Sequence, residues 1–281
     1  MTIPMPASAG MAAARGGAHA PGRFQPPEPP AMRQNFEASL KLTLKHEGEW
    51  ADHPRDPGGA TMKGITLATY RRFVPNATKT ALRNIAPAMV ARIYRLDYWD
   101  KVGADRLATG VDLATFDAGV MSGPGRAKKW LAASLGGADH QTVKMLCGKR
   151  LGFVRSLAIW RSFGGGWGKR IAAIEARGVA WALAASLPGH EVKAALADEH
   201  RAAQAKARTR AAGSGGTGAA TAGGGGDLML NPGHAEQLAG WSIAALLAAG
   251  MLVALVFAVR AVLHRQRAAA YRAEIEAMGD A

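Results

Sequence analysis

The pattern of apolar positions first predicts a helix that begins near residue 35. Apolar residues recur at positions i, i+4 and i+8, which places them on one stripe of a helix: Phe36, Leu40 and Leu44. Asn35 is a suitable N-cap in front of this stripe, and Gly48 is suited to end the helix. Glu47 continues the same stripe. The pattern therefore predicts a carboxyl group, partly removed from water, at the C-terminal end of a helix.

The rest of the chain divides into segments with contrasting patterns. Residues 1–34 are rich in Pro, Ala and Gly and contain no apolar run long enough for a cleavable signal, so we expect them to be disordered. Residues 35–187 show the pattern of a mainly α-helical globular domain. Residues 188–239 combine a basic, Ala-rich stretch with a Gly-rich segment that is typical of a flexible linker.

An uncharged apolar run, GWSIAALLAAGMLVALVFAV, occupies residues 240–259. Its length suits a helix that crosses a bilayer core of about 30 Å, which predicts one C-terminal transmembrane helix in contact with membrane lipid. Arginines follow the run from Arg260 onward, whereas residues 211–239 contain no Lys or Arg. The positive-inside rule then predicts a single-pass protein of the bacterial inner membrane, with the tail 260–281 in the cytoplasm and the domain in the periplasm. The opposite orientation, with the domain held in the cytoplasm, stays open because no export signal is evident.

Charge and cysteine content narrow the possible partners. The chain of 281 residues has a formal net charge of +14, which suits anionic partners such as peptidoglycan, anionic lipid or nucleic acid. No helix-turn-helix, zinc-finger or RNP pattern is present, so nucleic acid is not an expected partner. Cys147 is the only cysteine, which excludes an intramolecular disulfide. No Cys/His cluster has the spacing of metal ligands, so we expect neither a metal nor an organic cofactor.

Two carboxylates carry the candidate chemistry. Glu47 is followed by the turn sequence Asp56-Pro57-Gly58-Gly59, which brings a second carboxylate into the same region. Glycoside hydrolysis uses a protonated carboxylic acid together with a second carboxylate, and partial desolvation of Glu47 favours its protonated form. Each residue also has a simpler interpretation. Glu47 can be a solvated residue at a helix end, and Asp56 can cap a turn with its side chain.

The same residues belong to a longer set of motifs. These are HEGEW at 46–50, DPGGATMKGIT at 56–66, YWD at 98–100, FDAGV at 116–120, LGFVR at 151–155 and FGGGWGKR at 163–170. Together they resemble glycoside hydrolase family 108, the lysozyme-like N-acetylmuramidases often labelled secretion-activating proteins. The resemblance covers about residues 35–177. Two positions depart from the family pattern: Glu49 replaces a Gly, and Met121 or Ser122 stands where the family usually has Asn.

The resemblance implies a lysozyme-like helical domain with a short loop or hairpin at its active site, and a peptidoglycan-binding portion at about 138–180. It implies hydrolysis of the β-1,4 bond between N-acetylmuramic acid and N-acetylglucosamine, with peptidoglycan as the partner. Glu47 matches the catalytic acid, and Asp56 and Thr66 match further motif positions. The candidates for substrate contact are Trp50, Tyr70, Trp99, Asp117 and Trp167. A non-catalytic peptidoglycan-binding or phage structural protein on the same fold is the alternative, and intact Glu47 favours the enzyme.

Overall fold

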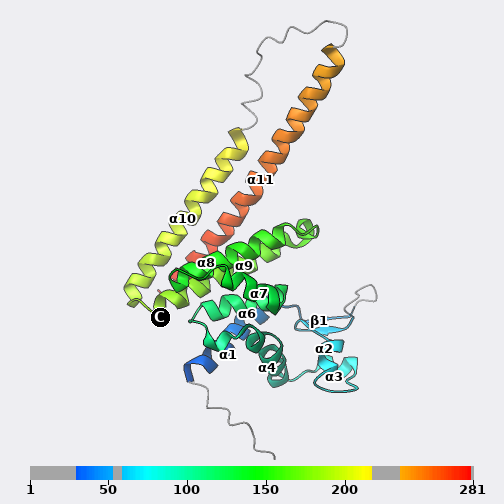
Figure 1. Ribbon diagram of the computed structural model, residues 1–281, viewed down its shortest axis with the longest axis vertical. Helices are drawn as coiled ribbons and strands as arrows, with labels where there is room; N and C mark the ends of the chain where they lie inside the picture. Colours follow the sequence, from blue (N-terminus) through cyan, green and yellow to red (C-terminus); the bar gives the residue numbers. More distant parts are fainter. Residues whose placement is uncertain (1–29, 53–58, 217–234, 280–281) are drawn as a thin grey trace, which may run out of the picture.

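The computed structural model describes residues 30–52, 59–216 and 235–279, and this part of the chain is mainly helical, as the sequence predicts (Figure 1). The longer helices are α1 (Pro30–Leu44), α6 (Val111–Ser122), α7 (Pro124–Ala132), α8 (Asp139–Arg155), α9 (Trp160–Ala184), α10 (Gly189–Gly216) and α11 (Ala235–Ala277). The shorter elements are β1 (Trp50–Ala51), β2 (Thr61–Met62), β3 (Ile65–Thr66), α2 (Leu67–Arg71), α3 (Lys79–Arg83), α4 (Pro87–Tyr94), the π-helical η1 (Arg95–Trp99), α5 (Asp100–Val102) and the 3-10 helix η2 (Ala104–Arg106).

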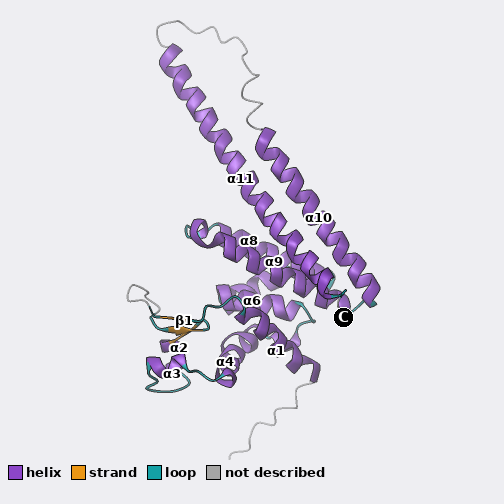
Figure 2. Ribbon diagram, turned by 180° about the vertical axis from the view of Figure 1, so that it is seen from behind, coloured by secondary structure: helices purple, strands orange, loops and turns teal. Residues whose placement is uncertain are grey.

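A small antiparallel sheet of order β1-β2-β3 lies beside the helices, as Figure 2 shows. Strands β2 and β3 pair Met62 with Ile65, so only Lys63 and Gly64 connect them. Both connecting residues have positive φ, 49° for Lys63 and 74° for Gly64. This is the geometry of the tight turns whose twist matches that of paired strands. The sheet is the short hairpin that the family resemblance implies.

Helix α6 forms the centre of the globular part. Every residue of α6 from Val111 to Gly119 is buried. Helices α1, α7, α8 and α9 all contact α6, so it has no face toward solvent over this stretch. A helix that is apolar on nearly all sides is expected in such a position.

Helix α1 differs from the predicted helix at both ends. It begins at Pro30, so Asn35 lies within the helix and does not cap it. The Asn35 side chain instead donates a hydrogen bond to Asp112 Oδ2 at 2.9 Å. The helix ends at Leu44, and Glu47 lies in the turn that follows. The backbone N–H of Glu47 still donates a hydrogen bond to the Leu44 carbonyl at 3.2 Å, so Glu47 lies in a hydrogen-bonded turn directly after the helix.

Helix α9 is continuous through Gly164, Gly165 and Gly166, although three successive glycines disfavour a helix. A β-carbon on Gly164 would lie 2.5 Å from the ring of Trp160, so glycine is needed for this ring to pack against the helix. The helical conformation is retained because packing of α9 against α8 and α6 outweighs the low helix propensity of glycine.

Helices α10 and α11 pack along each other and project together from the globular part (Figures 1 and 2). The C-terminal part of α11 returns to pack on α9. There the buried Glu175 of α9 accepts hydrogen bonds from Arg267 Nη2 at 2.5 Å and from the Tyr271 hydroxyl at 2.9 Å. Arg177 of α9 pairs with Glu274 of α11 at 2.9 Å. The end of α11 is therefore part of the globular packing.

The predicted transmembrane helix is not supported. The run 240–259 lies within α11, and the side chains of residues 240–248 and 250 lie outside the described part. Across the described helices, no segment combines the length and the apolar character that a bilayer crossing requires.

The predicted cytoplasmic tail, residues 260–281, contacts the globular domain in the structure. Arg267 and Tyr271 belong to the predicted cytoplasmic tail, yet both bond to Glu175 in the globular domain. Two groups in hydrogen-bond contact lie on the same side of any membrane. A hydropathy pattern treats Arg267 as a free charge, whereas in the structure it is the partner of the buried Glu175 carboxylate.

Two further predictions fall largely outside the described residues. The disordered segment 1–34 is described only from residue 30 onward, and residues 217–234 of the predicted linker lie outside as well. The part of that linker before residue 217 belongs to helix α10.

Candidate active site

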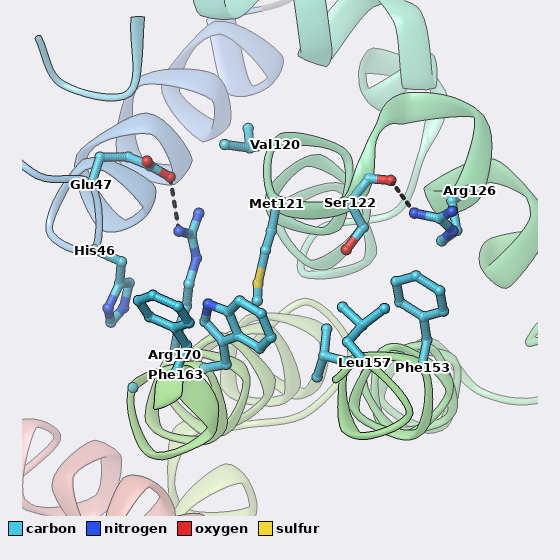
Figure 3. A pocket seen from close by; sticks show the side chains of 13 residues that line it. His46, Glu47, Val120, Met121, Ser122, Arg126, Phe153, Leu157, Phe163 and Arg170 are labelled. Carbon is cyan, nitrogen blue, oxygen red and sulfur yellow. Dashed lines mark hydrogen bonds and ion pairs between the residues drawn. The ribbon is translucent and has the colours of Figure 1, made fainter. Parts of the chain in front are cut away.

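A pocket of about 650 Å³ lies where the turn after α1 faces helices α6, α7, α8 and α9. Figure 3 shows Glu47 at one end of the pocket and Arg126 at the other. The lining residues are His46, Glu47, Val120, Met121, Ser122, Arg126, Phe153, Val154, Leu157, Phe163, Gly166, Trp167 and Arg170. Glu47 is the one carboxylate among these described lining residues.

The Glu47 carboxylate is held by Arg170. Arg170 Nη1 on α9 donates to Glu47 Oε1 at 2.8 Å, and the Glu47 side chain is 18% exposed. Figure 3 shows this contact as a dashed line between the two side chains. The carboxylate thus has a defined orientation and remains accessible from the pocket.

Arg170 is in turn fixed by Asp117, which is fully buried on α6. Arg170 Nη2 pairs with Asp117 Oδ1 at 2.8 Å, and Arg150 Nη1 pairs with Asp117 Oδ2 at 2.6 Å. Thr43 Oγ1 donates to Asp117 Oδ1 at 3.0 Å. Burial alone would raise the pKa of Asp117, but the two guanidinium groups lower it well below its usual range, so Asp117 stays charged. A charged Asp117 anchors the guanidinium that orients Glu47.

The hairpin turn closes the other side of Glu47. A β-carbon on Gly64 would lie 2.8 Å from Glu47 Oε2 and 2.7 Å from the Tyr94 hydroxyl. The Tyr94 hydroxyl donates to the Lys63 carbonyl at 2.8 Å and ties the turn to α4. Burial, and then the nearby Glu47 charge, raises the pKa of Tyr94 far above its usual value, so Tyr94 remains a donor.

Aromatic and cationic groups line the rest of the pocket. Phe163 and Trp167 of α9 stack with ring centroids 5.8 Å apart. The guanidinium carbon of Arg126 lies 4.1 Å from the centroid of the Phe153 ring, and Arg126 Nη1 donates a hydrogen bond to the Ser122 carbonyl at 2.9 Å. Flat aromatic faces beside hydrogen-bonding groups suit sugar rings, whose faces are apolar and whose edges are polar.

His46 also lines the pocket beside Glu47. Its pKa lies below the ordinary value because of burial first and the positive charge of Arg170 second. His46 is therefore neutral at neutral pH. Among the described residues, no group of three or more His, Cys, Asp or Glu side chains is arranged to hold a metal ion.

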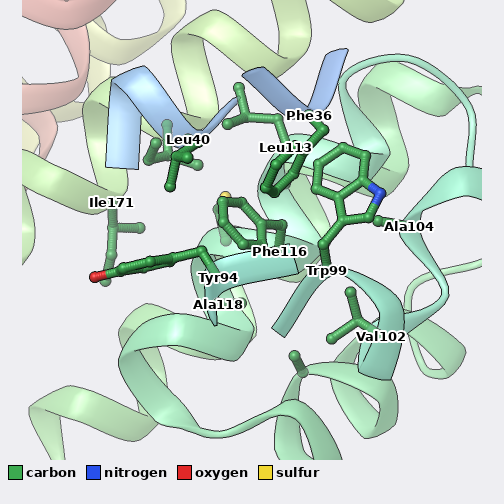
Figure 4. Close-up of a cluster of buried hydrophobic side chains, with 14 of the residues drawn as sticks. Phe36, Leu40, Tyr94, Trp99, Val102, Ala104, Leu113, Phe116, Ala118 and Ile171 are labelled. Atoms are coloured by element: carbon green, nitrogen blue, oxygen red, sulfur yellow. The ribbon is translucent and has the colours of Figure 1, made fainter. Parts of the chain in front are cut away.

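Three predicted substrate-contact residues are placed in the protein interior. Asp117 is fully buried and its oxygens are engaged by Arg150, Arg170 and Thr43. Trp99 has no exposed surface and packs edge-on against the core ring of Phe116 at 5.4 Å (Figure 4). Tyr70 is buried on α2. None of the three lines the pocket: Trp99 and Tyr70 fill the core as large aromatic side chains, and Asp117 is held inside by its ion pairs.

The remaining predicted residues have different positions. Trp167 lines the pocket. Trp50 does not line the pocket; it is half-buried on β1, and the guanidinium carbon of Arg83 lies 5.7 Å from the centroid of the Trp50 ring. The Thr66 hydroxyl caps α2 by accepting from Thr69 Nα at 3.1 Å and is also absent from the lining. Asp56 lies outside the described residues.

Glu49, the departure from the family pattern beside Glu47, faces water. Its side chain is 76% exposed and pairs with Lys63 at 3.4 Å. Glu49 therefore belongs to the surface and not to the pocket.

Arg170, Arg150 and Tyr94 are the site residues that sequence reasoning missed. Arg170 lies in the FGGGWGKR motif, and its position in that motif was the available signal. Its contact with Glu47 spans 123 positions, which no local pattern reports. Arg150 and Tyr94 had no such signal.

Comparison with known proteins adds family information to this geometry. The sequence model of glycosyl hydrolase 108 matches residues 40–123. SagA of Brucella abortus, a solved structure, is 33% identical over 53% of this chain and 97% of the SagA chain, with a TM-score of 0.48. No curated protein matches the chain. The matched family residues include Glu47, the hairpin and Asp117.

Proposed function

Because the chain belongs to the glycosyl hydrolase 108 family, and is thereby a glycoside hydrolase, we propose that it cleaves the glycan of peptidoglycan. The proposed bond is the β-1,4 linkage between N-acetylmuramic acid and N-acetylglucosamine. The observation that carries the proposal is the accessible Glu47 carboxyl, oriented by Arg170 at the end of a pocket with an aromatic wall.

Glu47 is proposed as the general acid. Cleavage of a glycosidic bond requires a proton on the leaving oxygen, and a positioned carboxylic acid supplies it. Arg170 and the Gly64 turn hold the carboxyl from two sides, so the proton is delivered from one fixed direction. Such positioning lowers the barrier because the reacting groups do not need to be ordered during the reaction.

The second group of the reaction stays a prediction. Asp56 comes after Glu47 in the sequence, in the turn sequence that precedes β2. We propose that it orients water or stabilises positive charge on the sugar. Thr66 is a weaker candidate than the sequence indicates, because its hydroxyl already accepts the Thr69 amide.

The test is digestion of purified peptidoglycan by the wild-type protein and by Glu47→Gln. Glutamine keeps the shape of the side chain but has no proton to donate, so activity should fall by about 10²-fold or more. The products should be reduced with borohydride and analysed. Reduced muramic acid at the new ends supports the proposed bond, and reduced glucosamine indicates cleavage of the other linkage. Non-reducing anhydro ends indicate a transglycosylase reaction at the proposed bond.

The alternative is a protein that binds peptidoglycan without cleaving it. Wild-type protein that sediments with peptidoglycan but releases no fragments supports this alternative. Equal release of fragments by wild type and Glu47→Gln contradicts the assignment of the acid.

The periplasm is the proposed compartment of the domain, since peptidoglycan lies there. Contact between Glu175 and Arg267 requires the domain and the end of α11 to share that compartment. Protease added to spheroplasts should digest both, and protection of both until the membrane is permeabilised would contradict the periplasmic placement.

A further inference from the structure

An exposed apolar surface runs along α11 where this helix leaves the globular part. The exposed side chains are Met251, Leu252, Val253, Leu255, Val256 and Val262, with exposed fractions from 37% to 68%. Apolar side chains exposed over successive turns of one helix mark an interaction surface more often than a solvated one.

A groove of about 640 Å³ continues this surface between α11 and the N-terminal end of α9. Leu255, Val256 and Val262 form one wall, and Trp160 lies on the other. Arg155 and Arg161 also line the groove, so it is apolar along its length with cations on one side.

The cations around this groove have no carboxylate partner in the part of the chain that the structure describes. Among the described residues, Arg155, Arg161 and Arg260 form no ion pair. The pKa of Arg155 lies below its ordinary value because of partial burial first and the positive charge of Arg260 second. Arg155 lines the groove, and Arg260 lies close enough to Arg155 for their like charges to interact.

Positive charge continues on the neighbouring face of α11. Burial lowers the pKa of His264, and Arg267, Lys206, Arg210 and Arg260 lower it further. Arg210 of α10 lies over the Phe257 ring at 5.6 Å. Basic residues of α10 therefore lie beside this part of α11.

We propose that this surface binds an anionic phospholipid bilayer. The surface consists of the apolar residues from Met251 to Val262 together with Arg155, Arg161 and Arg260. The hydrocarbon region would contact the apolar side chains, and lipid phosphates would contact the arginines. Uncompensated cations beside an apolar face are the arrangement that interfacial helices use on anionic membranes.

The chemistry favours a lipid over other anions. A free phosphate satisfies the arginines but leaves the apolar groove in water. A nucleic acid likewise offers phosphates but no hydrocarbon for Leu255 and Val256. An anionic phospholipid satisfies both, and charge on the arginines selects it over a neutral lipid.

The test is co-flotation of the full chain with vesicles of phosphatidylcholine alone or mixed with phosphatidylglycerol. The triple variant Arg155→Gln, Arg161→Gln, Arg260→Gln removes the cations of the surface. At about 1 kcal/mol for each cation near an anionic membrane, its affinity for the mixed vesicles should fall about a hundredfold. The control variant Lys41→Gln, Lys128→Gln, Lys129→Gln removes the same charge from exposed positions on α1 and α7, and its affinity should fall by much less.

Several results would overturn the proposal. These are equal binding of wild type to both kinds of vesicle, unchanged binding of the triple variant, or an equal loss in the control variant. Stronger loss of duplex DNA binding than of vesicle binding in the triple variant would assign the surface to nucleic acid. Circular dichroism of each variant establishes that it is folded.

A second variant, Leu255→Ser with Val256→Ser, should weaken vesicle binding while leaving its salt dependence in place. Vesicle binding does not require catalysis, so its failure is separate from failure of the proposed hydrolase activity.

Discussion

Gly64 and Glu47 lie so close that only a hydrogen atom fits between the Gly64 backbone and the carboxylate. A β-carbon on Gly64 would lie 2.8 Å from Glu47 Oε2. The hairpin turn and the candidate acid are thus one packed unit, although they are separated in the chain by β1 and β2.

We expect Gly64→Ala to remove hydrolase activity. The added methyl would displace the Glu47 carboxyl or the turn itself, because Tyr94 blocks the other direction at 2.7 Å. Gly59→Ala is the matched control, since Gly59 also has positive φ, 64°, but has no atom within 4 Å of its β-carbon position. Both variants should lose about 1–2 kcal/mol of stability from the left-handed backbone. Rates of peptidoglycan cleavage should separate them, and similar activity in the two would refute the packing argument.

Arg170→Lys should lower kcat and leave KM nearly unchanged. Lysine keeps the charge, but its single ammonium group replaces a planar fork that bridges Asp117 and Glu47. We expect a loss of about tenfold or more in kcat, as for other misplaced catalytic groups. Arg177→Lys, on the same helix but not in the pocket lining, serves as the control and should retain full activity. A change in KM alone would point to substrate binding and not to orientation of the acid.

Arg267→Gln should destabilise the globular domain. Its removal leaves Glu175 buried with Tyr271 as the remaining donor, and loss of one partner of a buried ion pair costs about 3–5 kcal/mol. Arg272→Gln breaks an exposed pair with Glu276 on the same helix and should cost less than about 1 kcal/mol. Urea unfolding of the two variants measures the difference. By the same reasoning, deletion of residues 227–281 should destabilise the domain. Equal stability of both point variants would show that α11 does not support α9.

Stability should fall on acidification through protonation of His46. Because the pKa of His46 is lower in the folded state than in the unfolded chain, the folded state binds fewer protons. The His46 contribution is therefore fully present above the unfolded value of about 6.5 and is lost as pH falls through the folded value. Between about pH 7.5 and pH 5, the melting temperature of His46→Gln should fall less than that of the wild type. This window brackets the pKa of His46 in the unfolded chain. His190→Gln, at a histidine whose side chain is 82% exposed, should behave as wild type. An identical pH profile for His46→Gln and wild type would contradict this prediction.

Local sequence was sufficient for the mainly helical class, the family and the position of Glu47. These properties depend on short spacings: the period of Phe36, Leu40 and Leu44, and the motif from His46 to Thr66. The same spacings place Glu47 close to the end of α1, although in the turn that follows the helix, and the glycines in a tight turn, where φ is positive at Gly64. A one-dimensional pattern reports these features because neighbouring residues produce them.

Tertiary structure decided which groups surround Glu47. Arg170 is 123 positions away from it, and Arg267 is 92 positions away from Glu175. Such pairs form only when α9 packs against the turn after α1 and against α11. Burial likewise separated Trp167, which lines the pocket, from Trp99, which fills the core, although both are tryptophans in family motifs. Hydropathy counts apolar and charged residues without their partners. It therefore predicted a membrane-crossing run with a free basic tail where packing instead joins Arg267 to a buried carboxylate.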